Sequence, residues 1–306
     1  MAAGVALGSA APEFAGALES LLWPALGLLL YTTFTQVPLT HLPEAFRDGR
    51  FMAAVLFGNF VLVPLAVWGL LAFAPVDPAI RLGILLVLLV PCTDWFITFT
   101  HLGGGDARRA IAVTPVNLLV QLALLPLYLW LFMGDAFLEL LTADRVAAVF
   151  VTLILLPLAA AWLTERWAEP STSRRGIVAQ IGWWPVPLLG LVVFMIAASQ
   201  LPAVQGALPA LGPVTVTFVV FLIAAMLIGM VLARALQLPA ASARALIFSL
   251  GTRNSFVVLP LALALAPPWQ TAALVIVLQS LVELFGMAAY LWAVPRLLPK
   301  PPSEKI

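Results

Sequence analysis

The sequence predicts an all-α polytopic membrane protein with nine transmembrane helices. Of its 306 residues, 63% are hydrophobic and only 9% are charged, and the mean hydropathy is +1.09. Soluble domains use about 25% charged residues to cover their surface. Two further observations support this fold class: nine apolar runs have the length of a membrane span, and the Lys and Arg residues between them fall mainly in alternate loops.

The first four spans are separated by short loops with charged residues, Pro or Gly. A helix needs about 20 apolar residues to cross the hydrocarbon core of a bilayer. Within the third span, the segment Pro91-Cys92-Thr93-Asp94 interrupts the apolar run with a proline and polar side chains. The predicted spans are Phe14–Thr40, Phe51–Ala74, Ala79–Leu102 and Ala107–Met133.

The remaining five spans contain a second interruption, in the eighth span. The segment Ser249-Leu250-Gly251-Thr252-Arg253-Asn254-Ser255 places a guanidinium near the middle of the membrane, where a charge without a partner or ligand costs at least several kcal/mol. A charge in that position predicts a functional or structural partner nearby. The predicted spans are Asp144–Ala168, Ile177–Gln200, Pro209–Leu236, Ser242–Ala266 and Trp269–Pro295.

The distribution of Lys and Arg predicts the orientation of the chain. Basic residues collect in cytoplasmic loops. With nine spans, twelve of the 15 Lys and Arg residues fall on one side, Arg81 and Arg145 fall on the other, and Arg253 lies within a span. We therefore expect a multi-pass protein of the cell (plasma) membrane, with the N-terminus outside and the C-terminus in the cytoplasm.

The order of the helices suggests an inverted repeat. Helices one to four match helices six to nine, because each set has its interrupted helix third, followed by a helix with polar residues in its middle. Matching helices are five apart, an odd number, so the two units have opposite orientations. Broken helices that cross near the midplane are a recurrent transporter design. Helix five begins the second unit and has no counterpart in the first. The predicted units are residues 14–133 and 144–295, followed by a cytoplasmic tail, 296–306.

The two interruptions predict one polar cluster near the membrane midplane. A helical rise of about 1.5 Å per residue places Asp94 roughly 12 Å, and Arg253 roughly 16 Å, from the cytoplasmic ends of their helices. Asn117, Asn59 and Glu283 fall in the same layer. The predicted cluster consists of Asp94, Asn117, Arg253, Asn254 and Glu283, with Cys92, Thr93, Ser249, Thr252, Ser255, Thr114 and Gln121 as secondary members.

Two interpretations of Asp94 and Arg253 remain open from the residues. They form a structural ion pair between the broken helices, or they belong to a substrate and proton site, because interrupted helices present free backbone groups to a ligand. Glu283 is either a proton carrier or an acceptor for Arg253. The predicted substrate-binding residues are Cys92, Thr93, Asp94, Asn117, Arg253, Asn254 and Ser255; those for ion or proton coupling are Asp94, Glu283, Ser249, Gln121 and Thr114.

Several classes of protein are disfavoured by the composition. A formal net charge of +1 gives no basic field for nucleic acid. One cysteine excludes an internal disulfide, and two histidines without an HExxH or CxxC pattern predict no resident metal or other cofactor. An intramembrane enzyme is disfavoured because the sequence has no GxSxG or HExxH motif. The expected partners are the lipid bilayer, a small-molecule or oxyanion substrate and protons.

At its two interruptions the chain resembles the superfamily that unites bile acid:sodium symporters with arsenite efflux permeases of the yeast-type arsenical-resistance family. The resemblance extends from Leu21 to Pro295 and includes Phe46-Arg47-Asp48 and Pro91-Cys92-Thr93. Pro-Cys-Thr is typical of the arsenite permeases, whose essential cysteine corresponds to Cys92. The resemblance implies a panel of helices one, five and six beside a core of the other six, with alternating access between them.

The chain departs from both branches at the second interruption. The arsenite permeases have a functional Glu in a pattern like Asn-Asn-Phe-Glu, whereas this chain has Asn254-Ser255-Phe256-Val257. The bile acid symporters have a sodium-binding Glu and Gln at the positions of Ser249 and Arg253. A guanidinium there repels sodium and replaces its charge.

The resemblance therefore implies a secondary-active transporter. Its first expected activity is arsenite efflux, coupled to protons or driven by the gradient of the substrate itself. Trivalent arsenic prefers thiolate partners, as soft metals do, and Cys92 offers one thiol. Transport of an organic anion, such as a bile acid-like carboxylate, is the alternative, because Arg253 suits a carboxylate equally well.

Overall fold

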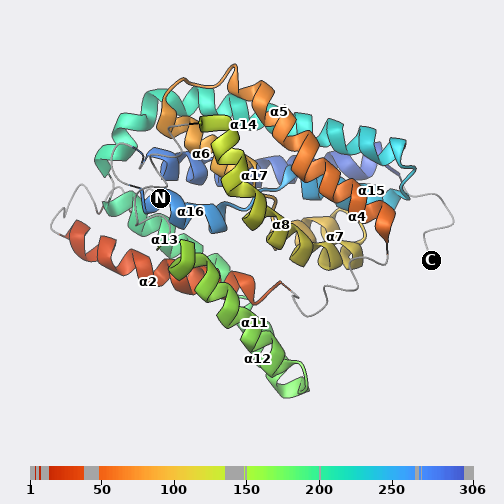
Figure 1. Cartoon of the computed structure of the whole chain (residues 1–306), viewed down its shortest axis with the longest axis horizontal. Helices are drawn as coiled ribbons and strands as arrows, with labels where there is room; N and C mark the ends of the chain where they lie inside the picture. Colours follow the sequence, from red (N-terminus) through yellow and green to blue (C-terminus); the bar gives the residue numbers. More distant parts are fainter. Residues whose placement is uncertain are drawn as a thin grey trace.

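The computed structural model of the chain is a bundle of helices (Figure 1). It describes residues 14–37, 48–134, 150–199, 201–265 and 271–299, together with four isolated positions, and these ranges contain helices and no strands. Seven helices within these ranges are long and apolar enough to cross a membrane. The chain is therefore an all-helical, multi-pass membrane protein.

The first half of the chain follows the predicted spans closely. The predicted span Ala107–Met133 coincides with one helix, whereas the predicted span Ala79–Leu102 is divided into two shorter helices. The first predicted span ends earlier than expected, at Phe34, and its residues beyond Val37 lie outside the described ranges. The elements are α2 (Ala15–Phe34), α4 (Gly49–Phe57), η3 (Gly58–Leu62), α5 (Val63–Leu71), α6 (Pro78–Leu88), α7 (Trp95–Leu102) and α8 (Ala107–Met133).

The second half differs from the prediction in two places. A turn at residues 182–184 divides the predicted span Ile177–Gln200, because Pro185 lacks the N–H that would continue the preceding helix. The helix predicted from Pro209 already begins at Leu201. The elements are η4 (Phe150–Leu155), α11 (Leu156–Ala168), α12 (Thr172–Ile181), α13 (Pro185–Ser199), α14 (Leu201–Ala235), α15 (Ala240–Gly251), α16 (Ser255–Leu263) and α17 (Thr271–Leu297).

A proline explains the irregular middle of the second span. Pro64 has no N–H to donate to the carbonyl of Phe60, four residues earlier, and the backbone forms the π-helix η3 just before it. The Tyr128 hydroxyl of α8 donates to this carbonyl. Short π-helical segments often occur at functional sites, and η3 carries the buried residue Asn59.

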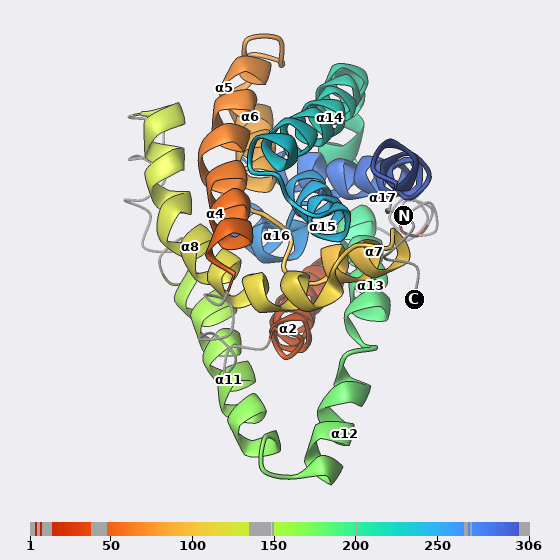
Figure 2. The ribbon, with the colours of Figure 1, turned by 90° about the vertical axis from the view of Figure 1, so that its right-hand side faces the viewer.

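The helices pack in two groups. Helix α2 packs against α11 and α13, and the Tyr31 and Thr164 hydroxyls lie 3.0 Å apart between α2 and α11. In the second group, α17 packs against α6, α14 and α16, and α15 packs against α14. Figure 2 shows α2, α11, α12 and α13 on one side of the remaining helices. The two groups share fewer contacts, chiefly through α16 and α2.

Gly83 permits the close approach of α6 to α17, and its replacement is expected to destabilise the fold. A Cβ at this position would lie 2.7 Å from Val275 Cβ and 2.8 Å from the Ala272 carbonyl oxygen. We expect Gly83→Ala to lower the free energy of unfolding by about 1–3 kcal/mol, as overpacking usually does. Thermal unfolding in detergent measures this effect.

Gly69 of α5 is the matched control, because a Cβ there meets no heavy atom within 4 Å. We expect Gly69→Ala to leave stability unchanged or to raise it by about 0.5–1 kcal/mol, the helix preference of Ala over Gly. A Gly83→Ala protein as stable as the Gly69→Ala protein would contradict the packing of α6 on α17.

Candidate functional site: the crossing of two interrupted helices

The candidate site lies where the two interrupted helices meet. Helix α6 ends at Leu88 and α7 begins at Trp95, while α15 ends at Gly251 and α16 begins at Ser255. The segments between them lie antiparallel, with Pro91 opposite Arg253. The Cys92 N–H donates to the Thr252 carbonyl at 3.2 Å, and the Asn254 N–H donates to the Val90 carbonyl at 2.8 Å. Four helix ends therefore meet at one buried point.

Side-chain hydrogen bonds also hold the two unwound segments together. Asn254 donates to the Thr93 hydroxyl at 3.0 Å, which joins the two unwound segments directly. The same side chain accepts from the Val257 N–H and caps α16. Thr252 donates to the Phe248 carbonyl at 2.8 Å. Asn254 and Thr93 thus hold the geometry of the crossing.

The guanidinium of Arg253 is buried among neutral oxygens. It donates to the Asn59 side-chain oxygen at 2.8 Å and to the carbonyls of Leu88, Ser249 and Leu250 at 3.2, 3.1 and 2.7 Å. Its central carbon, Cζ, lies 5.4 Å from the centre of the Phe221 ring. The side chain is only 3% exposed, so these contacts replace most of the water that a free cation would bind, while Nε has no hydrogen-bond partner within the described residues.

The interpretation of Asp94 and Arg253 as a structural ion pair is wrong. Both residues lie in the described part of the chain, and no contact joins their charged groups. The physical reason is the polarity of helix ends, which attract cations at the C-terminus and anions at the N-terminus. Arg253 binds carbonyls at the C-terminal ends of α6 and α15, whereas Asp94 occupies the N-cap position of α7.

Asp94 instead interacts with the cysteine two residues before it. The Cys92 thiol donates to Asp94 Oδ1, with the two atoms 3.0 Å apart. The other carboxylate oxygen, Oδ2, is buried and has no hydrogen-bond partner within the described part of the chain. The thiol therefore lies beside an acceptor that can take its proton.

Glu283 connects the crossing to α17 through a chain of hydrogen bonds. Ser255 donates to the Gln279 side-chain oxygen at 2.8 Å, and the Gln279 amide donates to Glu283 Oε2 at 2.7 Å. The same carboxylate oxygen accepts from the backbone N–H of Arg253 at 2.8 Å. The Arg253 guanidinium attracts this carboxylate but makes no hydrogen bond to it. Glu283 is 8% exposed and is the buried carboxylate nearest this backbone segment.

Three predicted residues of α8 are buried but are not joined to the crossing by hydrogen bonds. Thr114 donates within its own helix, to the Ala110 carbonyl. The amide groups of Asn117 and Gln121 are buried and have no hydrogen-bond partner within the described residues. Unpaired buried amides are costly, so these two side chains are available to a water, an ion or a ligand.

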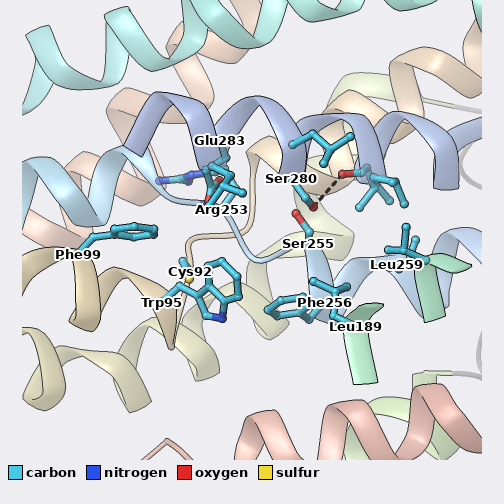
Figure 3. A pocket seen from close by; sticks show the side chains of 15 residues that line it. Cys92, Trp95, Phe99, Leu189, Arg253, Ser255, Phe256, Leu259, Ser280 and Glu283 are labelled. Atoms are coloured by element: carbon cyan, nitrogen blue, oxygen red, sulfur yellow. Dashed lines mark hydrogen bonds between the residues drawn. The ribbon is translucent and has the colours of Figure 1, made fainter. Parts of the chain in front are cut away.

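A cavity of about 140 Å³ opens beside the crossing. Figure 3 shows Cys92, Ser255 and Glu283 among the side chains that line it, with the ring of Trp95 next to Cys92. Leu189 and Val193 of α13 complete the wall, so the cavity lies between the two helix groups. Most of the other lining side chains are apolar.

Two side chains outside the predicted site contact it. Asn59 binds both Ser249 and Arg253, and Gln279 binds both Ser255 and Glu283. Each is an amide within an otherwise apolar span; the helical rise places Asn59 in the layer of Glu283, and Gln279 is a polar residue in the middle of the last span. Neither residue lies near an interruption in the sequence, so only the packing of the helices reveals its contacts with the site.

Two interrupted helices that meet in a buried site are a recurrent feature of membrane transporters. The model of the Sodium Bile acid symporter family matches residues 23–207, which is more than half of the chain. The chain belongs to this family, and it is a membrane transporter of the bile acid symporter kind. A search of curated proteins gave no match.

Proposed function

We propose that this chain exports arsenite by alternating access, with protons as the coupling ion. The observation that carries the proposal is the Cys92 thiol, which lines the cavity at the crossing and donates to a buried carboxylate. Sulfur ligands are preferred by soft metals, and trivalent arsenic behaves like them. Among the described residues of the cavity wall, no other residue type offers such a ligand.

The thiol and Asp94 together support reversible binding of arsenous acid. The Cys92 sulfur attacks arsenic, one As–O bond breaks and one As–S bond forms. Asp94 accepts the thiol proton, and the proton leaves with the hydroxide as water, so that charge and atoms balance. A single As–S bond holds the substrate loosely enough to release it, as a transport site requires.

The size of the cavity supports a small substrate. Pockets for drug-sized ligands usually have volumes of about 300–1,000 Å³, whereas this cavity has about 140 Å³. A molecule with one arsenic and three oxygens fits this space, and a sterol skeleton exceeds it. The volume favours arsenite over a bile acid-like anion in this conformation.

An organic anion is the second candidate, because the family description names bile acid. Arg253 would be the expected partner of a carboxylate. Its two terminal nitrogens already donate to protein oxygens. Arg253 also lines the cavity, however, and its Nε has no hydrogen-bond partner within the described part of the chain. Only this part of the guanidinium is left to bind such a substrate.

Protons are proposed as the coupling ion because buried carboxylates lie beside the cavity. Glu283 lines it directly, and Asp94 contacts the cavity-lining Cys92. Carboxylates in membrane interiors commonly act as proton carriers. The family description also names sodium, but we propose protons in its place for this chain.

Movement between the two helix groups would supply alternating access. The cavity lies at their boundary, with Leu189 on one side and Cys92 and Glu283 on the other. We propose that α2, α11 and α13 form the panel and the other spans the core. We also propose the inverted repeat of units 14–133 and 144–295, with a cytoplasmic tail after it.

The proposed orientation in the cell membrane, with the N-terminus outside, predicts that the turn between α11 and α12 is cytoplasmic. Thr172 is exposed at this turn. In a Cys92→Ser background, Thr172→Cys should resist an impermeant thiol reagent added to intact cells and react after the cells are opened. Equal labelling before and after opening would reverse the topology.

Uptake into everted membrane vesicles tests the proposed substrate. With an imposed proton gradient, vesicles containing this chain should accumulate labelled arsenite, and excess antimonite, which is also thiol-reactive, should reduce the uptake. Taurocholate should neither accumulate nor compete. Taurocholate uptake without arsenite uptake would support the organic anion candidate instead.

A further inference from the structure

The surroundings of the Arg253 guanidinium are those of a bound cation. Its Nη2 nitrogen has two hydrogens, yet three oxygens lie within 3.1 Å of it: the side-chain oxygen of Asn59 and the carbonyls of Ser249 and Leu250. The carbonyl of Leu88 lies 3.2 Å from Nη1. All four oxygens are neutral. We refer to them as the oxygen cradle.

Two helix ends explain why these oxygens converge. Leu88 is the last residue of α6, and Ser249 and Leu250 lie in the last turn of α15. Carbonyls in the last turn of a helix have no intrahelical partner, and the C-terminal end of a helix carries partial negative charge. Two such ends meeting in a buried site favour a cation there, whatever group supplies it.

Asn59 completes the cradle from a third element, the π-helix η3. Its side-chain nitrogen donates to the Val55 carbonyl at 3.2 Å and to the Ser249 hydroxyl at 3.1 Å. These two bonds use the nitrogen and direct the oxygen toward Arg253. The orientation of the amide is therefore set by groups other than the guanidinium.

We propose that the oxygen cradle is a monovalent-cation site which the Arg253 side chain occupies permanently. A sodium ion does not fit beside the guanidinium, because the cradle oxygens are already bound and the two positive charges repel each other. The arginine supplies the charge that a bound cation would supply, and the crossing is complete without sodium. Removal of the side chain opens the cradle to sodium.

This inference extends the proposed choice of protons over sodium. The test of the cation site measures stability and not transport. The cation site can therefore be disproved while arsenite export is confirmed, and arsenite export can be disproved while the cation site is confirmed. The wild-type protein, Arg253→Ala, Arg253→Lys and the double variant Arg253→Ala with Asn59→Ala are purified in detergent. Their unfolding temperatures are then measured in NaCl and in choline chloride at equal ionic strength.

We expect sodium to raise the unfolding temperature of Arg253→Ala by several degrees, in a saturable manner, because a ligand that binds the folded state stabilises it by mass action. The wild type and Arg253→Lys should show no difference between the two salts, because each fills the cradle with its own cation. The double variant should lose most of the sodium effect, since it lacks one cradle oxygen.

Two outcomes would overturn the inference. One is an Arg253→Ala protein that unfolds at the same temperature in both salts. The other is a wild-type protein that sodium stabilises specifically, and this measurement does not depend on the folding of any variant. Recovery of folded Arg253→Ala from sodium buffer, but not from choline buffer, would support the inference in the same way as the temperature shift.

Discussion

Cys92→Ser is expected to reduce arsenite uptake into everted vesicles to the level of vesicles without the protein, a loss of at least about tenfold. A loss of only 1.4 kcal/mol in binding corresponds to tenfold, and the As–S bond is the proposed basis of binding. Serine keeps a donor for Asp94, which accepts from Cys92 at 3.0 Å. The substitution therefore removes the sulfur and preserves the local hydrogen bond.

Ser280→Ala is the matched control, because Ser280 lines the same cavity and donates to the Ile276 carbonyl of its own helix. Arsenite uptake by this variant should stay close to that of the wild type. Both variants should reach the membrane in equal amounts, as judged by immunoblot. Undiminished uptake by Cys92→Ser would exclude an As–S bond from the transport cycle.

Glu283→Gln is expected to make transport insensitive to pH and to a protonophore. The Glu283 carboxylate accepts from the Gln279 amide and from the Arg253 backbone N–H through one oxygen. A glutamine side chain can accept both bonds with its own oxygen, so the crossing is preserved while the titrating group is lost. Arsenite uptake, measured from pH 6 to pH 8, should rise with the imposed proton gradient in the wild type and stay flat in the variant.

Glu169→Gln provides the control for this pair of measurements. Glu169 is an exposed residue that follows α11, away from the cavity. Its replacement should leave the pH profile of uptake unchanged. A Glu283→Gln profile that matches the wild type would remove Glu283 from the proton pathway and leave Asp94 as the remaining carboxylate beside the cavity.

The sequence was most informative about the helices and least informative about the contacts between them. Hydropathy located the span Ala107–Met133 at the bounds that α8 has in the structure. The polar segment around Pro91 marked the division between α6 and α7. These features depend on residues that are local in the sequence, and local composition determines them.

The partners of Arg253 could not be predicted in this way. Three of its four acceptors are backbone carbonyls, which every residue has, so no residue type marks them. The fourth, Asn59, is 194 residues away in the chain. Opposite charges at similar depth favour a pair between Arg253 and Asp94, but the polarity of the helix ends directs the two side chains apart.

The residues of the proposed site are buried, and several of them lie in one hydrogen-bonded group. Thr93, Asn254 and Ser255 lie at the crossing with Arg253. Asn117 and Gln121, on α8, have side-chain amides without a hydrogen-bond partner in the part of the chain that the structure describes. Their partners depend on the substrate or ion that enters, and sequence patterns do not specify these partners.

Arsenite retention by living cells tests the proposed activity most directly. Cells that lack their own arsenite exporter are loaded with arsenite while expressing either this chain or an empty vector. Export by this chain predicts lower intracellular arsenite in the expressing cells, and a protonophore should abolish the difference. Equal retention, with the protein detected in the cell membrane, would contradict arsenite export and would leave an organic anion as the substrate to test.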